Sequence, residues 1–243
     1  MTSREATSLL PRDQARNSRS WRDWAALVAI GAVQWPWLLR SLDGGSEKAR
    51  HALLDSLELP HAALPNLGSW KADVGLLKLV TDHIAVHRPQ VMVEFGAGAS
   101  TLVAARALQR SGEGRLFSFE QHEDFVEATF RWLAEYGLEA EIRAAPLRPS
   151  PGWPGLWYDH GSLPESIDLL LVDGPPWTVH PLTRGAADSL FDRIAVGGTV
   201  MLDDAARPGE RLVARRWRKR WPNFEFCLDK SGSKGTLIGT RLR

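Results

Sequence analysis

Short apolar runs of strand length recur along the chain from residue 90 onward, and stretches with helical spacing lie between them. One of these runs, IDLLLVD, is apolar almost throughout, which is typical of a strand covered on both faces. Strands that alternate with helices predict βαβ units and a parallel sheet. The predicted strands are 91–95, 115–120, 140–145, 167–173 and 198–204, and the predicted helices are 74–86, 101–109, 124–136 and 182–194.

The pattern changes after residue 210. Residues 211–221 have the spacing of a helix with a solvated basic face. Two further strands, 223–229 and 235–241, flank the polar loop 230–234, which is typical of a hairpin. We therefore expect the sheet to end in an antiparallel pair. Tryptophan interleaved with arginine also occurs in nucleic-acid sites, but the rest of the chain has no basic bias, so we expect no nucleic-acid partner.

The first 40 residues differ from the rest. Residues 1–20 are polar and lack the apolar centre of a secretory signal, so we interpret them as a loose tail. Residues 21–40 are apolar and flanked by tryptophans, and Pro36 is expected to break the helix near its end. About 15 apolar residues are too few to span a bilayer. Two interpretations stay open: a helix packed on the domain or on a second subunit, and a helix lying on a membrane surface.

Composition narrows the class of protein. The chain has 243 residues, 44% of them apolar, with 30 Lys and Arg against 29 Asp and Glu. It is long enough for a buried core, and its charge favours no polyanionic partner. The single cysteine, Cys227, excludes an internal disulfide framework and a cysteine-based zinc cluster. We expect a cytoplasmic protein, or one peripheral to a membrane, with a tail (1–20), a helical appendage (21–66) and a main domain (67–243).

The segment that joins the first predicted strand to its helix reads EFGAGAST, from Glu94 to Thr101. Glycines here let the backbone approach a ligand, and the helix N-terminus offers free N–H groups. A dinucleotide fingerprint would need a third glycine in place of Thr101, and no P-loop sequence occurs. Glu94 suits a ligand with an ammonium group rather than a phosphate. Glu120, at the end of the next strand, can receive both hydroxyls of a ribose.

Five segments together resemble class I S-adenosylmethionine-dependent methyltransferases: VMVEFGAGAST, FSFE, AAPL, LLVDGPP and MLDDA, within about residues 70–243. The resemblance implies an α/β fold, namely a Rossmann-like doubly wound sheet of seven strands whose last strand is antiparallel. An N-terminal helical appendage precedes it here. The resemblance also implies S-adenosylmethionine as the cofactor. The residues that it assigns to cofactor binding are Glu94, Gly96, Ala97, Gly98, Ser100, Thr101, Glu120, Gln121, Ala145, Pro146, Leu147, Asp173 and Gly174.

Three carboxylates end neighbouring predicted strands: Asp173 after the fourth, and Asp203 and Asp204 after the fifth. We expect them to converge in an arrangement that suits Mg²⁺, with Asp173 and Asp204 also candidate catalytic groups. This is similar to metal-dependent O-methyltransferases of the catechol and caffeoyl-CoA type. However, Asp204 stands where those have asparagine, and Pro176 where the catechol type has lysine. The alternative is that the two adjacent aspartates cap a helix start and pair with Arg207.

The stretch DGPPWTVHPLTRGAA is closer to another branch of these methyltransferases, which has a D-G-P-P sequence and a later arginine. Within it, His180 is an alternative catalytic base, because imidazole is partly neutral near pH 7. Arg184 is a candidate clamp for an acidic group of the substrate. Trp157 and Tyr158 lie in a long loop, 148–166, and are candidate substrate contacts, either as a lid or as a packed flap.

We therefore predict an S-adenosylmethionine-dependent methyltransferase that acts on a hydroxyl or amine of a small molecule. O-methyl transfer is favoured, with Mg²⁺ as a candidate assistant. One alternative is a nucleotide- or NAD-binding oxidoreductase on a similar sheet, against which Thr101 counts. The other is a module that binds the cofactor or a partner without catalysis. Assembly into a homo-oligomer is a further hypothesis.

Overall fold

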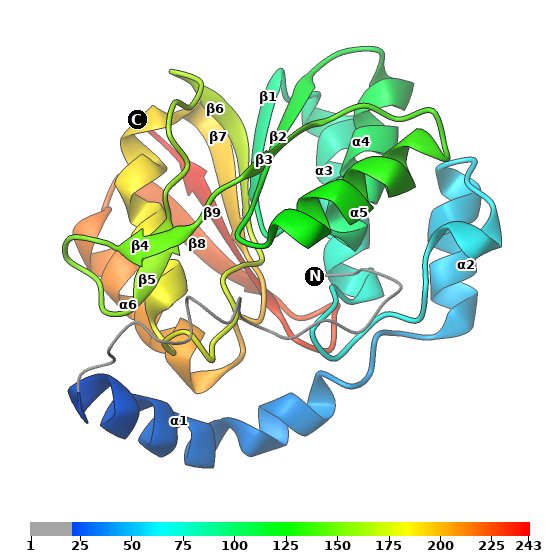
Figure 1. Cartoon of the computed structure of the whole chain (residues 1–243). Coiled ribbons are helices and arrows are strands. Elements are labelled where there is room, and N and C mark those ends of the chain that lie inside the picture. The colour runs from blue at the N-terminus through cyan, green and yellow to red at the C-terminus, as the bar shows by residue number, and fades with distance from the viewer. Residues whose placement is uncertain (1–20) are drawn as a thin grey trace.

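The computed structural model describes residues 21–243, so the predicted tail lies outside the described residues. A seven-stranded sheet forms its centre, in the order β3-β2-β1-β6-β7-β9-β8 (Figure 1). The strands from β3 to β7 in this order are parallel, and β9 is antiparallel to both of its neighbours. The strands are β1 (Val91–Phe95), β2 (Arg115–Glu120), β3 (Glu141–Ala144), β6 (Ile167–Val172), β7 (Ile194–Leu202), β8 (Phe224–Asp229) and β9 (Thr236–Arg241). The predicted seven-stranded sheet with an antiparallel last strand is confirmed.

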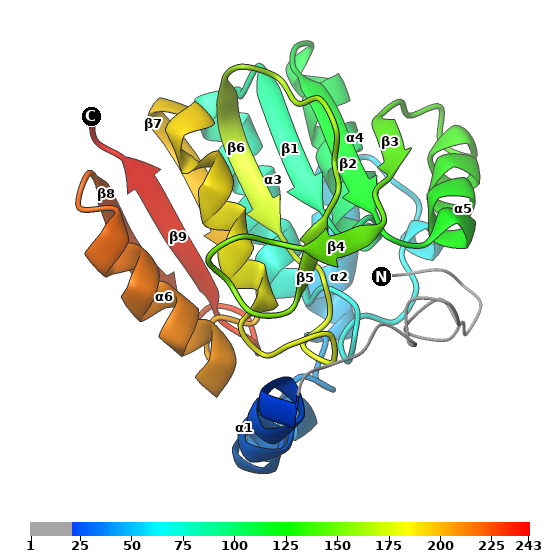
Figure 2. The same ribbon diagram turned by 60° about the vertical axis from the view of Figure 1, so that its left-hand side comes forward.

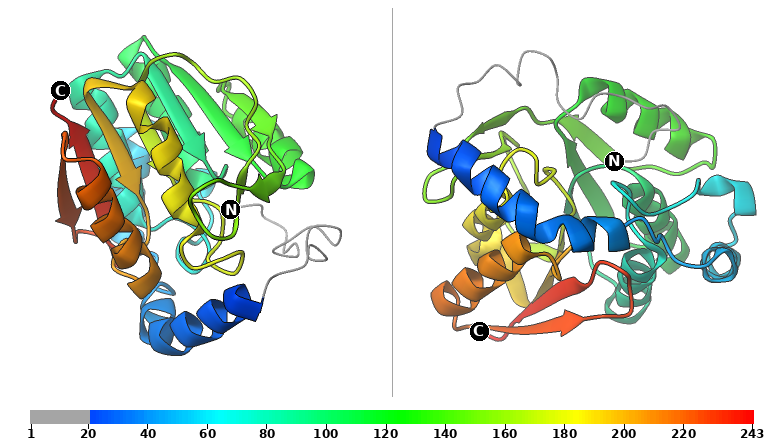
Figure 3. Two further views of the ribbon diagram at one scale, coloured as in Figure 1. Left: turned by 90° about the vertical axis from the view of Figure 1, so that its left-hand side faces the viewer. Right: turned by 90° about the horizontal axis from the view of Figure 1, so that it is seen from below.

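The helices cover both faces of this sheet (Figures 2 and 3). Four helices contribute to the core on one face: α2 (Glu47–Ser56), α3 (Val74–His87), α4 (Ala99–Ser111) and α5 (Glu123–Ala134). The other face packs against the 3₁₀ helix η3 (Thr183–Arg193) and α6 (Pro208–Arg220). A short 3₁₀ turn, η2 (His61–Ala63), follows α2.

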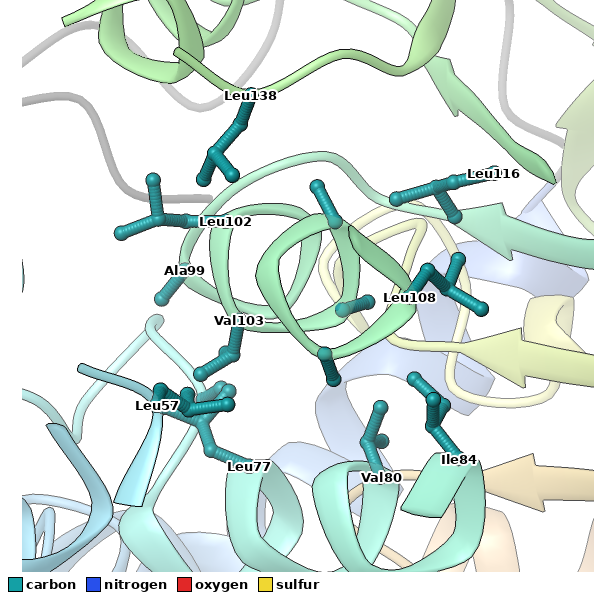
Figure 4. Packing of buried hydrophobic residues seen from close by; sticks show 14 of the residues in the cluster. Leu57, Leu77, Val80, Ile84, Ala99, Leu102, Val103, Leu108, Leu116 and Leu138 are labelled. Atoms are coloured by element: carbon teal, nitrogen blue, oxygen red, sulfur yellow. The ribbon is translucent and has the colours of Figure 1, made fainter. Parts of the chain in front are cut away.

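Successive residues of the central strands serve opposite cores, because side chains alternate along a strand. Met92 of β1 belongs to the core that contains Leu102 and Val103 of α4, where Figure 4 shows the packing around that helix. The next residue, Val93, belongs to the opposite core, together with Trp217 of α6. This two-sided burial explains the apolar runs from which these strands were predicted.

Local sequence determines where the helices next to the sheet edge begin. At α3, the Asp73 carboxylate accepts a hydrogen bond from the backbone N–H of Leu76 at 2.8 Å. At α4, the Thr101 hydroxyl accepts the N–H of Gly98 at 2.8 Å, so this helix starts at Ala99, two residues before the predicted start. Each contact satisfies an N–H group that has no partner within its helix.

Three elements differ from the sequence-based expectation. The long loop contains a small antiparallel hairpin, β4 (Leu147–Pro149) with β5 (Leu156–Tyr158). The segment predicted as an ordinary helix at 182–194 forms the 3₁₀ turns of η3. Its Gly185 lies so close to the Trp153 ring that a Cβ there would be 2.2 Å from a ring carbon. Strand β7 starts four residues before its predicted first residue.

Helix α1 (Trp21–Arg40) continues through Pro36, so the expected break at this proline is wrong. Proline removes a backbone donor and leaves the carbonyl of residue 32 without its helical partner. Both Pro36 and Ala32 are exposed, so water can satisfy that carbonyl. In the described part of the chain, no helix combines the length and the apolarity needed to cross a bilayer.

Helix α1 lies against the segment that follows β6. Asp23 Oδ1 is 3.8 Å from His180 Nε2, and Gly31 faces the Trp177 indole. The outward face is apolar, with Trp21 and Trp35 75% and 58% exposed. Contact of this helix with a membrane surface or with a second copy stays a prediction.

Residues after α1 share the core of the main domain. Leu53 and Leu54 of α2, and Leu57 just after it, are buried in one hydrophobic cluster. Leu77 and Val80 of α3 belong to the same cluster. The division of the chain near residue 66 stays a prediction, and the two sides of it are packed together.

Candidate functional site

The carboxyl ends of β1, β2, β6 and β7 meet at one edge of the sheet, and the candidate residues gather there. The N–H groups of Asp173 and Gly174 both donate to the Phe95 carbonyl, at 2.9 and 2.8 Å. These bonds join the end of β6 to the end of β1. The Gly96 N–H donates in turn to the Phe119 carbonyl of β2 at 2.9 Å. The edge is therefore fixed by backbone hydrogen bonds.

The turn after β1 requires glycine at its first position. Gly96 has a φ of +100°, which side-chain-bearing residues rarely adopt. A Cβ at this position would lie 2.9 Å from the backbone nitrogen of Gly174. The loop that continues through Ala97 and Gly98 therefore lies directly against the end of β6.

Glu94 is fully buried beneath this loop. Its Oε2 accepts hydrogen bonds from the Thr101 hydroxyl at 2.6 Å and the Ser118 hydroxyl at 2.7 Å. Burial raises the pKa of this carboxyl, and the hydroxyls of Ser100, Thr101 and Ser118 partly offset the effect. Among the described residues, no group donates a hydrogen bond to its Oε1. This buried oxygen therefore has unused acceptor capacity.

Glu120 ends β2 and faces the same loop. Its two carboxylate oxygens accept the N–H groups of Ala97 at 3.2 Å and His122 at 3.0 Å. Burial raises its pKa to about 7. The neighbouring Gln121 is also buried, and neither its amide oxygen nor its amide nitrogen has a hydrogen-bond partner among the described residues.

Three residues that the resemblance assigns to cofactor binding, Ala145, Pro146 and Leu147, follow β3 directly. The Ala145 N–H donates to the Glu120 carbonyl at 2.8 Å, and Pro146 accepts the N–H of Asp159 at 2.9 Å. Ala145 and Leu147 are buried. Together they form an apolar surface next to Glu120.

The structure brings the three predicted aspartates together: Asp173, Asp203 and Asp204 each place a carboxylate oxygen within 4.8 Å of the others. Asp204 has a φ of +58°, in the left-handed region. Both Asp203 oxygens are buried without a hydrogen-bond partner among the described residues. Burial and the neighbouring Asp204 charge raise the pKa of Asp203 well above its usual value.

Positive side chains surround Asp204. Its Oδ2 is 3.0 Å from Arg184 Nη1 and 2.7 Å from Arg207 Nη2, and its Oδ1 is 3.8 Å from Lys234 Nζ. Burial alone would favour the neutral acid, but the charges of these three residues lower the pKa of Asp204 below its usual value. The alternative predicted from the sequence, a pair between Asp204 and Arg207, is present. Neither adjacent aspartate caps α6, because the residue that precedes this helix is Arg207 itself.

A small cavity of about 20 Å³ opens beside this cluster, enough for about one water molecule. Five of its lining residues were predicted as site residues: Tyr158, Asp173, Gly174, Arg184 and Asp204. Ser69, Trp70, Pro176, Trp177 and Arg207 complete the lining.

Two of the residues predicted for catalysis or substrate contact, His180 and Trp157, are not part of this lining. His180 is buried, accepts the Leu182 N–H at Nδ1 (3.1 Å) and faces Asp23 of α1. Trp157 packs its ring against Phe95, with the ring centroids 4.9 Å apart. In the structure, His180 therefore lies next to α1, and Trp157 is part of the hydrophobic core.

Arg184 is only 5% exposed, and its guanidinium makes hydrogen bonds within the protein. It donates to the carbonyls of Pro175, Asp203 and Asp173, in addition to the Asp204 carboxylate. Its N–H groups therefore already have acceptors within the protein. In this arrangement the guanidinium does not act as the predicted clamp for an acidic group of the substrate.

Sequence reasoning missed Lys234, which was assigned only to the polar hairpin loop 230–234. Its side chain is 2% exposed, and Nζ lies 3.7 Å from Asp203 Oδ2. The sequence feature that could have indicated its burial is the glycine- and serine-rich composition of the loop, which allows close packing. In the structure, Gly232 of this loop lies against Gly75 of α3.

A larger hollow, of about 660 Å³, lies at the other end of the strands, around the starts of β2 and β3. Gly112, Gly114 and Glu141 are among its lining residues. None of the predicted cofactor or catalytic residues lines it.

Comparisons with known proteins found a match in sequence and several similar folds. Residues 93–205 match the sequence model of a family described as a methyltransferase domain. The fold is similar to that of an O-methyltransferase from Bacillus cereus solved with S-adenosylhomocysteine, at 14% identity and a TM-score of 0.55, over 88% of this chain and 99% of that one. It is also similar to an O-methyltransferase of tomaymycin synthesis from Streptomyces achromogenes solved with S-adenosylmethionine, at 17% identity and a TM-score of 0.51, over 87% and 96% of the two chains.

A methyltransferase from Podospora anserina bound to S-adenosylhomocysteine is a third similar structure, at 11% identity and a TM-score of 0.55, over 80% of this chain and 88% of that one. A comparison with curated proteins found no match. At these identities the likeness establishes a shared fold.

Proposed function

We propose that the protein is an S-adenosylmethionine-dependent methyltransferase that methylates a hydroxyl group, or alternatively an amine, of a small molecule. The observation that carries this proposal is the pair of buried carboxylates, Glu94 and Glu120, on either side of the glycine loop at the carboxyl edge of the sheet. The methyltransferase-domain match over residues 93–205 supports the same function.

The residues present fit the cofactor. A carboxylate suits its ammonium group, and Glu94 Oε1 is a buried acceptor without a partner among the described residues. The two oxygens of Glu120 suit the two ribose hydroxyls. The unpaired amide of Gln121 suits the polar edge of the adenine, and the apolar surface of Ala145 and Leu147 suits its ring. We assign the remaining loop residues, including Gly98 and Ser100, to the backbone cradle.

When bound, the cofactor supplies a methyl group activated by a positively charged sulfur. The chain must then hold the acceptor atom in line with that methyl group and accept its proton. We assign both tasks to Asp173, because its carboxylate lines the cavity next to Gly174. Asp204 is held as a counter-ion by Arg184 and Arg207, which makes it a poor proton acceptor. O-methyl transfer is favoured because two of the similar structures are O-methyltransferases.

Aromatic side chains enclose this position. Trp70, Trp177 and Tyr158 line the cavity, and the Tyr158 hydroxyl has no hydrogen-bond partner among the described residues. We propose that these rings contact the acceptor molecule and exclude water from it.

The three aspartates do not fit a divalent cation in the arrangement that the structure has. Mg²⁺ requires oxygen ligands at about 2.0–2.1 Å and keeps several waters. Here Arg184, Arg207 and Lys234 lie within 4 Å of the aspartate oxygens. No step of the proposed reaction uses a metal ion.

Isothermal titration calorimetry with S-adenosylhomocysteine tests the function, with NAD⁺ as the competing ligand. We expect micromolar binding of S-adenosylhomocysteine and none of NAD⁺. Glu120→Ala should lose the binding, whereas Glu135→Ala, which removes an exposed carboxylate just after α5, should keep it. Binding of NAD⁺ alone would support the oxidoreductase alternative. The absence of binding by either ligand would overturn the methyltransferase proposal.

A further inference from the structure

Three positively charged side chains face the three aspartates at the sheet edge, and each comes from a different segment. Arg184 belongs to η3, Arg207 precedes α6, and Lys234 belongs to the loop between β8 and β9. Their side chains are 6%, 7% and 2% exposed, respectively. A charge is expensive to bury unless an opposite charge accompanies it. The aspartates and these cations therefore form one buried ionic cluster, in which Arg207 also pairs with the buried Glu210 at 2.8 Å.

Arg184 joins the ends of two strands. At the end of β6 it donates to the carbonyls of Asp173 at 2.5 Å and Pro175 at 3.0 Å. At the end of β7 it donates to the Asp203 carbonyl at 3.2 Å and the Asp204 carboxylate at 3.0 Å. The planar guanidinium has donors that point in several directions, which suits it to this bridging role. A divalent cation shared by the same aspartates would bridge the same two strand ends.

Lys234 is held at a fixed position on the other side of the aspartates. Its Nζ donates to the Lys71 carbonyl at 2.7 Å, and its backbone N–H donates to the Asp73 carboxylate at 3.2 Å. From there Nζ is 3.7 Å from Asp203 Oδ2 and 3.8 Å from Asp204 Oδ1. The ammonium charge is therefore shared between these two carboxylates without a direct hydrogen bond to either.

A divalent cation would have to enter between these charges. An ion within coordination distance of the aspartates would lie close to both Arg184 and Lys234, and like charges at short range repel strongly in a buried site.

We propose that Arg184 and Lys234 take the place of a divalent metal ion, so that the protein holds Asp173, Asp203 and Asp204 in their working positions without binding one. The consequence for catalysis rests on the proposed function: methyl transfer proceeds in the presence of a chelator. The consequence for ion binding does not rest on it and is tested separately.

The first experiment measures ion binding by the full chain, with and without S-adenosylhomocysteine. Electron paramagnetic resonance detects free Mn²⁺, whose signal decreases when the ion is bound. We expect the signal of millimolar Mn²⁺ to be unchanged by stoichiometric protein. A saturable loss of signal, reversed by Mg²⁺, would overturn the proposal.

The second experiment removes one built-in cation. Lys234→Ala leaves the aspartates with an uncompensated charge, so we expect its melting temperature to fall by several degrees and to recover when Ca²⁺ or Mg²⁺ is added. Lys230→Ala removes an exposed lysine from the same loop and is the matched control. We expect neither the control nor the unmodified protein to respond to the ions.

A Lys234→Ala variant with unchanged stability and no response to ions would overturn the role of Lys234. If this variant does not fold, the Mn²⁺ measurement on the unmodified protein decides alone. If the protein binds neither Mn²⁺ nor S-adenosylhomocysteine, the inference about ions stands and the proposed function fails. If it binds S-adenosylhomocysteine and Mn²⁺, the proposed function stands and the inference fails.

Discussion

The affinity of the protein for S-adenosylhomocysteine should depend on pH through one buried carboxyl group. Burial raises the pKa of Glu120 to about 7. In the proposed complex, the ionised carboxylate accepts hydrogen bonds from both ribose hydroxyls, whereas the protonated acid has less capacity to accept them. Affinity should therefore be highest above pH 8 and decrease as the pH falls through 7.

The magnitude follows from the titration of a single group. With a pKa of about 7, the ionised fraction is about 90% at pH 8 and about 10% at pH 6, so the Kd should rise roughly tenfold, or about 1.4 kcal/mol, between them. Glu120→Gln keeps the size of the side chain and removes the titration. Loss of the charge-assisted hydrogen bonds should weaken binding by about 1.5–3 kcal/mol at pH 8 and leave a flat profile.

The assay is calorimetric titration at constant ionic strength from about pH 5.5 to about pH 8.5, around the pKa of this group. Adenosine is the second ligand, because it keeps the ribose and lacks the amino-acid group. We expect it to bind more weakly with the same dependence on pH. The exposed Glu135→Gln serves as the matched control for the substitution.

Two results would refute the reasoning. A flat profile for the unmodified protein would show that the charge of Glu120 does not contribute to binding. An equal slope in Glu120→Gln would assign the titration to another group.

The remaining predictions concern stability and acceptor binding. Without ligand, the raised pKa of Glu120 stabilises the fold below pH 4.5, and this contribution is lost as the pH rises through about 7; urea unfolding at both ends of the range should show a smaller change in Glu120→Gln. Gly96→Ala should destabilise the fold by about 1–3 kcal/mol from backbone strain alone, and by more than Gly112→Ala, because only the Cβ at Gly96 meets the backbone of another segment; equal losses in thermal unfolding would contradict the close contact. Arg184→Met should cost about 3–5 kcal/mol in urea unfolding, against less than about 1 kcal/mol for an exposed pair. Trp70→Ala should raise the KM for the acceptor while leaving the Kd of S-adenosylhomocysteine within about twofold, and a larger change in that Kd would move Trp70 to the cofactor side.

Much of the fold could be predicted because the central strands are buried on both faces. Runs such as 91–95 and 167–173 have few alternative structures, and the structure keeps both nearly unchanged. The same logic brought Asp173, Asp203 and Asp204 together, because the carboxyl ends of adjacent parallel strands must meet. Sequence order alone was sufficient for these inferences.

The misses have a different physical origin. Lys234 lies in a polar loop, where a lysine is usually solvated; it is buried only because residues far away in the chain pack over it. His180 has the chemistry of a base, but its position is set by the packing of α1, which no local pattern reveals. The β4–β5 hairpin was missed because its strands have three residues each, too short for alternation to be visible.

The contacts of the loop between β8 and β9 are expected to form late in folding, so the sheet edge is completed last. Ser233 donates to the Asp43 carbonyl, 190 residues earlier, and Lys234 reaches Lys71 across 163 residues. Contacts over such separations close the largest loops of the chain and form late, because their entropic cost is met only once the rest is in place. On the ribosome, the strands that carry the three aspartates emerge before their compensating lysine. Until the last hairpin has been synthesised, the three aspartates have Arg184 and Arg207 beside them in the chain but lack Lys234, so partly made chains should lack the finished site.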